Sequence, residues 1–329
     1  MCVAVAAQFI TDRTRHSLNI NPLPLMNAHL AETPLVCWMS SLSDDLALNH
    51  LTLPGSHDTC AYTIEDPLAK TQGATLAEQL AHGVRVLDIR CRHQDDVFHI
   101  NHAHIPLGLM FEDVIAVCAA FLARHPGECI VMSVKDECGS RDCTRSFAQT
   151  FGSYVRHHAG PRWYLGETIP SLGEVRGAIV LLRRFASESA LGIDLSAWPE
   201  NDTFELNLPT AAFSIQDEYR VPVRASIDYK FRVIEALLVH TGRSSLGRWM
   251  INFCSGTGMG ANPRMVACGD DGRRGINDMM VGRLAGHDGP CGTVMIDFCE
   301  YADWALVRAL VARNTPLMPD IGTVQMAGR

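Results

Sequence analysis

The polar residues that end three apolar stretches of this chain could carry acid–base chemistry. They are His57, Asp58, Asp88, Arg90 and His102. Each apolar stretch resembles a buried strand, and such strands would deliver their terminal side chains to one rim of a sheet. Histidine can accept or donate a proton near neutral pH because its unperturbed pKa is about 6.5. Together the five residues supply a base, an acid and a cation, the three groups that cleavage of a phosphodiester by an internal hydroxyl requires.

Strands and helices are predicted to alternate along the chain. We predict strands at 51–53, 84–90, 97–104, 129–134, 177–182, 213–216, 249–253 and 293–296, and helices at 40–48, 76–81, 111–124, 145–157, 227–240, 276–284 and 301–311. This alternation favours a parallel α/β sheet, and polar residues at strand C-termini are typical of a barrel of this class. We therefore expect one catalytic barrel domain over 36–329 after an N-terminal arm over 1–35. Residues 187–210, the longest irregular stretch, would serve as a lid or rim.

Composition and charge exclude several classes of protein. The net charge of the 329 residues is -8, which argues against a nucleic-acid partner. No apolar run reaches the roughly 18 residues that a membrane-spanning helix needs. The 12 cysteines show no zinc-type pairing, and the apolar N-terminus lacks a preceding basic region. We expect free thiols and a cytoplasmic or peripheral-membrane protein, with secretion as the alternative.

Seven segments, taken in order, resemble the X domain of phosphatidylinositol-specific phospholipase C in its bacterial form. They are Leu53-Pro-Gly-Ser-His-Asp58, Val86-Leu-Asp-Ile-Arg90, Ile130-Val-Met-Ser-Val-Lys135, Ile179-Val-Leu-Leu-Arg-Arg-Phe185, Ile215-Gln-Asp-Glu-Tyr219, Ile251-Asn-Phe253 and Val294-Met-Ile-Asp-Phe298. The combination is specific, although no single motif among them is. The resemblance implies a distorted (β/α)8 TIM-type barrel.

The resemblance also implies a role for each polar residue in a reaction that releases diacylglycerol and inositol 1,2-cyclic phosphate. His57 would be the general base, oriented by Asp297. His102 would be the general acid, coupled to Asp58. Arg90 would neutralise the phosphate, with Asp88 as its anchor. The residues that would hold the inositol ring are Lys135, Arg184, Asp217 and Tyr219.

Three points are open at this level. Arg90 stands where calcium-dependent relatives carry a metal-binding carboxylate, so we expect a metal-independent enzyme with no cofactor. His104 lies two residues after His102, and we expect both on one strand face, where either could be the acid, with His102 favoured. Arg183 competes with Arg184 for the ring, and we expect one of the two to be solvated.

Two other functions are alternatives to the lyase hypothesis. A metal-dependent barrel hydrolase would use His102 and His104 as a metal pair. A weakly active inositide-binding protein is the other, because Ala103 stands where the family often has glycine. We expect a monomer that meets phosphatidylinositol, or a related inositol lipid, at a membrane surface.

Overall fold

The computed structural model describes residues 34–157, 160–244, 247–287 and 289–317. The predicted arm over 1–35 falls almost entirely outside these residues, so the domain division remains a prediction. At the start of the described part, a 3-10 segment, Leu35–Ser41, buries Trp38 and Met39 against the barrel.

Eight parallel strands form the centre of the described structure. In spatial order they are β6 (Arg162–Tyr164), β7 (Ala178–Arg184), β5 (Ile130–Arg141), β2 (Val86–Gln94), β1 (Leu53–Ser56), β14 (Thr293–Ile296), β11 (Arg248–Phe253) and β10 (Ala212–Gln216). An antiparallel strand, β9 (Thr203–Asn207), pairs with β10 at one edge. The strand path runs from β6 to β9, and no ladder within the described residues joins these two ends. The fold is therefore a distorted (β/α)8 barrel that is open between β6 and β9.

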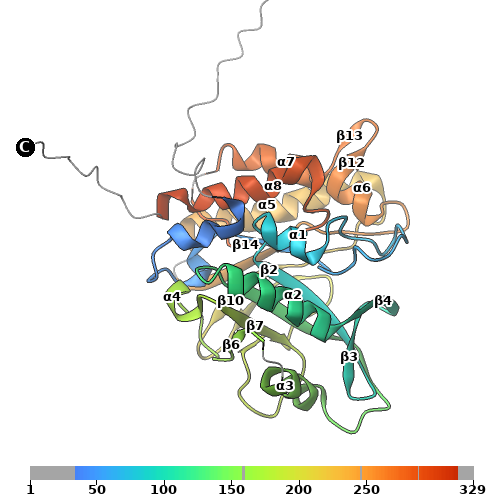
Figure 1. The fold of residues 1–329 in the computed structure, drawn as a ribbon. Coiled ribbons are helices and arrows are strands. Elements are labelled where there is room, and N and C mark those ends of the chain that lie inside the picture. The colour runs from blue at the N-terminus through green and yellow to red at the C-terminus, as the bar shows by residue number, and fades with distance from the viewer. Residues whose placement is uncertain (1–33, 158–159, 245–246, 288, 318–329) are drawn as a thin grey trace, which may run out of the picture.

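Helices surround the strands (Figure 1). They are α1 (Leu76–Ala81), α2 (Phe111–Arg124), α3 (Phe147–His157), α4 (Leu172–Val175), α5 (Ile227–Ser244), α6 (Pro263–Cys268), α7 (Ile276–Leu284) and α8 (Tyr301–Val311). Helix α2 shows why such segments are helical: Val114, Ile115, Cys118, Phe121 and Leu122 recur every three or four residues and are buried. Helix α1 begins with a capping box, in which Thr75 and Glu78 satisfy each other's backbone N–H groups.

The N-terminal rim of the barrel is held by a buried ion pair. Arg85, just before β2, lies 2.8 Å from Glu128, just before β5, and both side chains are fully buried. Glu128 also accepts hydrogen bonds from the backbone N–H groups of Met39 and Ser40. A buried pair that is hydrogen-bonded in this way fixes geometry, because removing one partner would leave an uncompensated charge. This ion pair stabilises the N-terminal end of the barrel, and the active site of such a barrel is expected at the opposite rim.

Three sequence predictions about the fold are wrong. Residues 40–48 form no α-helix; short 3-10 segments at Leu35–Ser41 and Leu48–His50 flank an irregular stretch instead. The stretch at 97–104 is not a parallel strand, because β3 (Val97–His102) and β4 (Ile105–Met110) form an antiparallel hairpin on the extended β2. Residues 187–210 include β8 (Ile193–Asp194) and β9, which pair with β7 and β10.

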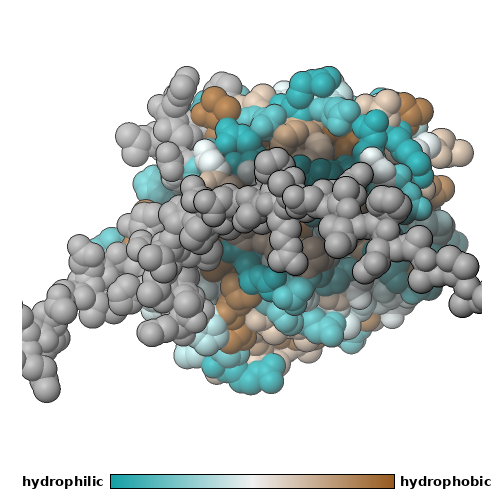
Figure 2. All heavy atoms as spheres, turned by 90° about the horizontal axis from the view of Figure 1, so that it is seen from above, coloured by the Kyte–Doolittle hydropathy of each residue, from teal (hydrophilic) through white to brown (hydrophobic). Residues whose placement is uncertain are grey.

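The cysteines, the helices and the surface agree with what the composition predicts. The eleven described cysteines are free thiols. None of the described helices combines the length and the hydropathy of a membrane span. On the face seen in Figure 2, hydrophilic side chains surround scattered hydrophobic ones. Scattered exposed apolar residues are normal for a protein surface.

Candidate active site

Neighbouring parallel strands bring the predicted site residues to one rim. Ser56 in β1 pairs with Ile296 in β14, so His57 and Asp297 follow at the same level. Gly55 makes this approach possible, because a Cβ there would lie 2.4 Å from the sulfur of Met295. The close packing of β1 between its neighbours therefore explains the glycine in the Pro-Gly-Ser segment.

Three cations lie in register on the strands next to β1. Arg90 in β2 pairs with Lys135 in β5, and Lys135 pairs with Arg184 in β7. Residues two apart in a strand share a face, so Asp88 is directed to the same side as Arg90. The sheet thus places cations on the three strands that follow β1 on the side away from β14.

His57 is hydrogen-bonded to a buried carboxylate. Its Nδ1 lies 2.7 Å from Oδ1 of Asp297, which is 1% exposed, and its Nε2 lies 3.4 Å from Oδ2 of Asp58. Burial alone would lower the pKa of His57, but the carboxylates of Asp297 and Asp58 outweigh it and raise that pKa above 6.5. With Nδ1 donating to Asp297, Nε2 is the ring atom available to accept a proton.

Asp58 also connects His57 with His102. Its Oδ2 lies 3.5 Å from Nε2 of His102, and the Nδ1 of that ring lies 2.7 Å from the backbone oxygen of Ala69. Asp58 has a positive φ of 39° and its side chain is 2% exposed. The buried Oδ2 of Asp58 has no hydrogen-bond partner in the described structure and lies between the two imidazoles.

Arg90 is held by three carboxylates. The guanidinium lies 3.1 Å from Asp58, 2.9 Å from Asp88 and 3.4 Å from Glu137. Burial opposes the charge of Arg90, but these three partners raise its pKa well above the ordinary value. Burial likewise opposes ionisation of Asp88, yet Arg90 and Arg184 hold its pKa below the ordinary value. Arg90 is therefore a fixed positive charge at the rim.

These groups line a cavity of about 240 Å³. Its walls are His57, Asp58, Thr71, Arg90, His102, Ala103, Lys135, Glu137, Glu200, Tyr219, Gly256, Thr257, Pro263 and Asp297. All five residues predicted to carry the catalysis line the cavity. Of the four predicted to hold the ring, Lys135 and Tyr219 line it as well.

The other two predicted ring-binding residues, Arg184 and Asp217, meet on Trp198. The guanidinium carbon of Arg184 lies 3.9 Å from the centre of a Trp198 ring, and the indole N–H donates to Asp217 at 3.0 Å. Two residues later, Glu200 lies 3.6 Å from Lys135 and accepts a hydrogen bond from the Tyr219 hydroxyl. Residues 198–200, within the segment predicted to be a lid or rim, thus contact all four residues that are predicted to hold the inositol ring.

His104 and Arg183 occupy different places from those expected. His104 is not on the strand face of His102, because β3 ends at His102 and a turn with Ala103 at a φ of 48° follows. The Nδ1 of His104 faces the sulfur of Cys138 at 3.7 Å, and the residue does not line the cavity. Neither arginine is solvated: Arg183 is 4% exposed and pairs with Asp194, while Arg184 is 8% exposed.

Sequence reasoning missed Glu137, Trp198 and Glu200. Glu137 accepts hydrogen bonds from Arg90 and from the Ala103 backbone, and Arg90 and Lys135 lower its pKa against the effect of burial. Its position two residues after Lys135, on the same strand face, was an available signal. Trp198 and Glu200 lie in an irregular segment, where no periodicity indicates direction.

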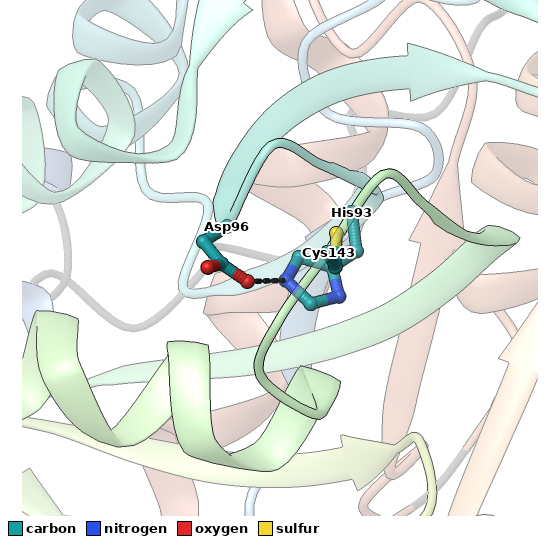
Figure 3. A group of neighbouring side chains, drawn as sticks. All are labelled: His93, Asp96 and Cys143. Carbon is teal, nitrogen blue, oxygen red and sulfur yellow. Dashed lines mark ion pairs between the residues drawn. The ribbon is translucent and has the colours of Figure 1, made fainter.

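One group of three possible metal ligands lies outside the cavity among the described residues: His93, Asp96 and Cys143 (Figure 3). Both ring nitrogens of His93 already have hydroxyl partners, at 2.8 and 2.9 Å. Asp96 accepts the backbone N–H groups of residues 144 and 145, and Cys143 donates to the Arg141 carbonyl. Because these atoms already form hydrogen bonds within the protein, we interpret the group as a structural contact that connects the β2–β3 turn to the segment before α3.

Comparison with known proteins agrees with this geometry. Residues 45–185 match the family model of the phosphatidylinositol-specific phospholipase C X domain. The chain is 30% identical over 260 residues to 1-phosphatidylinositol phosphodiesterase of Listeria monocytogenes, a match covering 77% of each chain. It is 33% identical over 222 residues to the Staphylococcus aureus protein of the same name, covering 61% of this chain and 67% of that one.

Solved structures give the same result. A mutant of the phosphatidylinositol-specific phospholipase C of S. aureus superimposes with a TM-score of 0.74 at 26% identity, over 85% of this chain and 98% of that one. The L. monocytogenes enzyme superimposes with a TM-score of 0.67 at 26% identity, over 86% and 99% of the two chains. The chain therefore belongs to the family of the phosphatidylinositol-specific phospholipase C X domain and has the barrel fold of its bacterial members.

Proposed function

We propose that this protein cleaves phosphatidylinositol into diacylglycerol and inositol 1,2-cyclic phosphate. The inositol 2-hydroxyl attacks the phosphorus atom, and the bond between phosphorus and the diacylglycerol oxygen breaks. The observation that carries the proposal is the arrangement of His57, Asp58 and His102 around one cavity, with Asp297 behind His57 and Arg90 beside Asp58.

In this mechanism each histidine moves one proton. His57 Nε2 takes the proton of the attacking hydroxyl, and Asp297 stabilises the imidazolium that forms. His102 gives its Nε2 proton to the departing oxygen. Asp58, between the two rings, stabilises whichever of them is charged. Hydrolysis of the cyclic ester would follow by the same groups with their roles reversed.

Arg90 supplies the positive charge for the phosphate. Its pKa is well above the ordinary value, so it stays charged throughout the working pH range. Its carboxylate partners orient the guanidinium before substrate binds, so little reorganisation is needed in the transition state. We therefore propose that the reaction proceeds without a metal ion or cofactor.

The ring would be held by Lys135, Arg184, Asp217 and Tyr219, the first three through the hydroxyls and the tyrosine by stacking. The competing metal-pair hypothesis loses support, because His104 is outside the cavity that His102 lines. We further propose that the protein acts as a monomer at a membrane surface.

The test is identification of the products by phosphorus NMR. Phosphatidylinositol vesicles incubated with the protein and excess EDTA should yield the cyclic phosphate first and inositol 1-phosphate more slowly. Formation of inositol 1-phosphate without the cyclic ester, or activity that requires added calcium, would contradict the proposal. The variant His57→Ala, checked for its fold by circular dichroism, should yield neither product.

A further inference from the structure

The structure contains a buried cation behind the active site to which the mechanism above gives no role. Lys230 lies in the first turns of α5 and is 1% exposed. The chain has only three lysines among its 28 basic residues, and the other two are partly exposed. Burying an ammonium group is costly unless its N–H groups find acceptors. The contacts of Lys230 therefore show what its burial achieves.

Lys230 holds the end of strand β10. Its Nζ donates to Oε1 of Gln216 at 2.9 Å and to the backbone oxygen of Glu218 at 2.7 Å. Oε1 of Gln216 also accepts the backbone N–H of Glu218 at 2.8 Å. Glu218 lies between Asp217 and Tyr219, so Lys230 fixes the backbone between two residues that the proposed function assigns to the ring.

The same network reaches the neighbouring strand. Nε2 of Gln216 donates to Oδ1 of Asn252 and to the backbone oxygen of Phe253, each at 2.8 Å. The ring of Phe253 lies edge-on to that of His57, with 5.9 Å between their centres. The buried ammonium thus connects the ends of β10 and β11 at the rim.

The electrostatic surroundings fit this position. Burial lowers the pKa of Lys230 to about 8, against the attraction of several acidic groups that include Asp217, Glu218 and Asp297. No carboxylate of the described residues forms a direct ion pair with Nζ. The charge of Lys230 therefore acts on these acidic groups from a distance, while its hydrogen bonds go to neutral oxygens.

We propose that Lys230 is a positioning residue, which holds the Asp217–Tyr219 segment in the conformation that receives the inositol ring. This inference rests on the proposed function. Lys230 does not line the cavity, so its effect passes through the backbone at Glu218. Because the segment contacts the ring and not the reacting atoms, loss of Lys230 should weaken substrate binding more than it slows the chemical step.

The first test compares Lys230→Met with Tyr229→Phe, using inositol 1,2-cyclic phosphate as a water-soluble substrate. Tyr229 is the preceding residue of α5, is exposed, and donates a hydrogen bond from its hydroxyl to the carboxylate of the same Glu218, so it is a matched control. Lys230→Met should raise KM at least tenfold and change kcat less than threefold, whereas Tyr229→Phe should change neither. A folded Lys230→Met protein with KM within twofold of wild type would overturn the proposal.

A second test needs no substitution. In wild-type protein with ¹⁵Nζ-labelled lysine, the three ammonium groups can be followed by NMR during addition of myo-inositol. We expect the signals of Lys135 and Lys230 to shift and that of Lys70 to remain. A shift of Lys135 alone would overturn the role of Lys230. A Lys135 signal that stays unchanged would instead refute ring binding at this cavity, which is part of the proposed function.

Discussion

Replacing Asp297 by asparagine tests the link between the buried carboxylate and the base. The substitution keeps the size of the side chain but removes the charge 2.7 Å from Nδ1 of His57. A hydrogen bond to a charged group contributes about 1.5–3 kcal/mol. If that stabilisation is lost only when His57 becomes an imidazolium, kcat should fall roughly 10- to 150-fold.

The direction of the accompanying pH shift also follows from the structure. In the wild type, Asp297 and Asp58 raise the pKa of His57 above 6.5 against the effect of burial. The base must be neutral to accept a proton, so activity should decline as the pH falls through this pKa. Without the Asp297 charge the burial effect gains weight, and the acid limb of the pH profile should move to lower pH.

The assay is the rate of cleavage of a soluble phosphatidylinositol analogue from pH 4.5 to 8.5 in the presence of EDTA. Asp303→Asn is the control, because the Asp303 carboxylate is 85% exposed and pairs with Arg308 on α8. That variant should match the wild type. If Asp297→Asn keeps kcat within threefold of the wild type, or its acid limb moves to higher pH, the reasoning about His57 is refuted.

Three further predictions concern His102, Arg90 and Ala103. His102→Gln should lower the rate about 10²–10⁴-fold with diacylglycerol as the leaving group, but should have little effect with nitrophenolate, which leaves without protonation by an acid. His104→Gln should have little effect with either leaving group. If instead His104→Gln is the variant that loses the rate, His104 is the acid. Arg90→Leu should lower kcat about 10²–10³-fold, and a folded variant with normal turnover would contradict its role at the phosphate. Ala103→Gly should stabilise the protein by about 0.5 kcal/mol in urea unfolding, because it relieves about 1–2 kcal/mol of strain from the left-handed backbone of residue 103. This relief exceeds the cost of the greater backbone entropy that glycine gives the unfolded chain. The control Ala116→Gly in α2 should destabilise the protein by about 1 kcal/mol. A stability loss at residue 103 would refute the strain argument.

Much of the fold could be predicted because the local pattern and the tertiary structure agree. The bounds of α2, α7, α8 and β14 match the sequence prediction, since apolar periodicity marks the helices and glycine or proline lies close to the ends of α2, α7 and β14. The strand ends before His57 and Asp297 followed from the same patterns, whereas β2 and β5 continue beyond Arg90 and Lys135, to Gln94 and Arg141. The barrel class is confirmed by the solved structures.

What could not be predicted depends on contacts between distant segments. The turn at Ala103 and the strand β4 after it were not predicted, because no glycine marks the turn and the predicted strand ran through it to residue 104. The contacts of Trp198 with Arg184 and Asp217 come from an irregular segment. Lys230 was missed for another reason: it lies four residues before Ile234, on the buried face of α5, but lysine is usually exposed, and the pattern does not show which acceptors its ammonium group would find.

The central claim is that the inositol 2-hydroxyl is the nucleophile and His57 its base. The most direct measurement uses phosphatidylinositol methylated at that hydroxyl. This compound should release no diacylglycerol but should compete with the natural lipid, because the cavity and the cations at its rim are unchanged. Release of diacylglycerol from the methylated lipid at a rate close to that from phosphatidylinositol would show that water attacks the phosphorus directly, and would contradict the account.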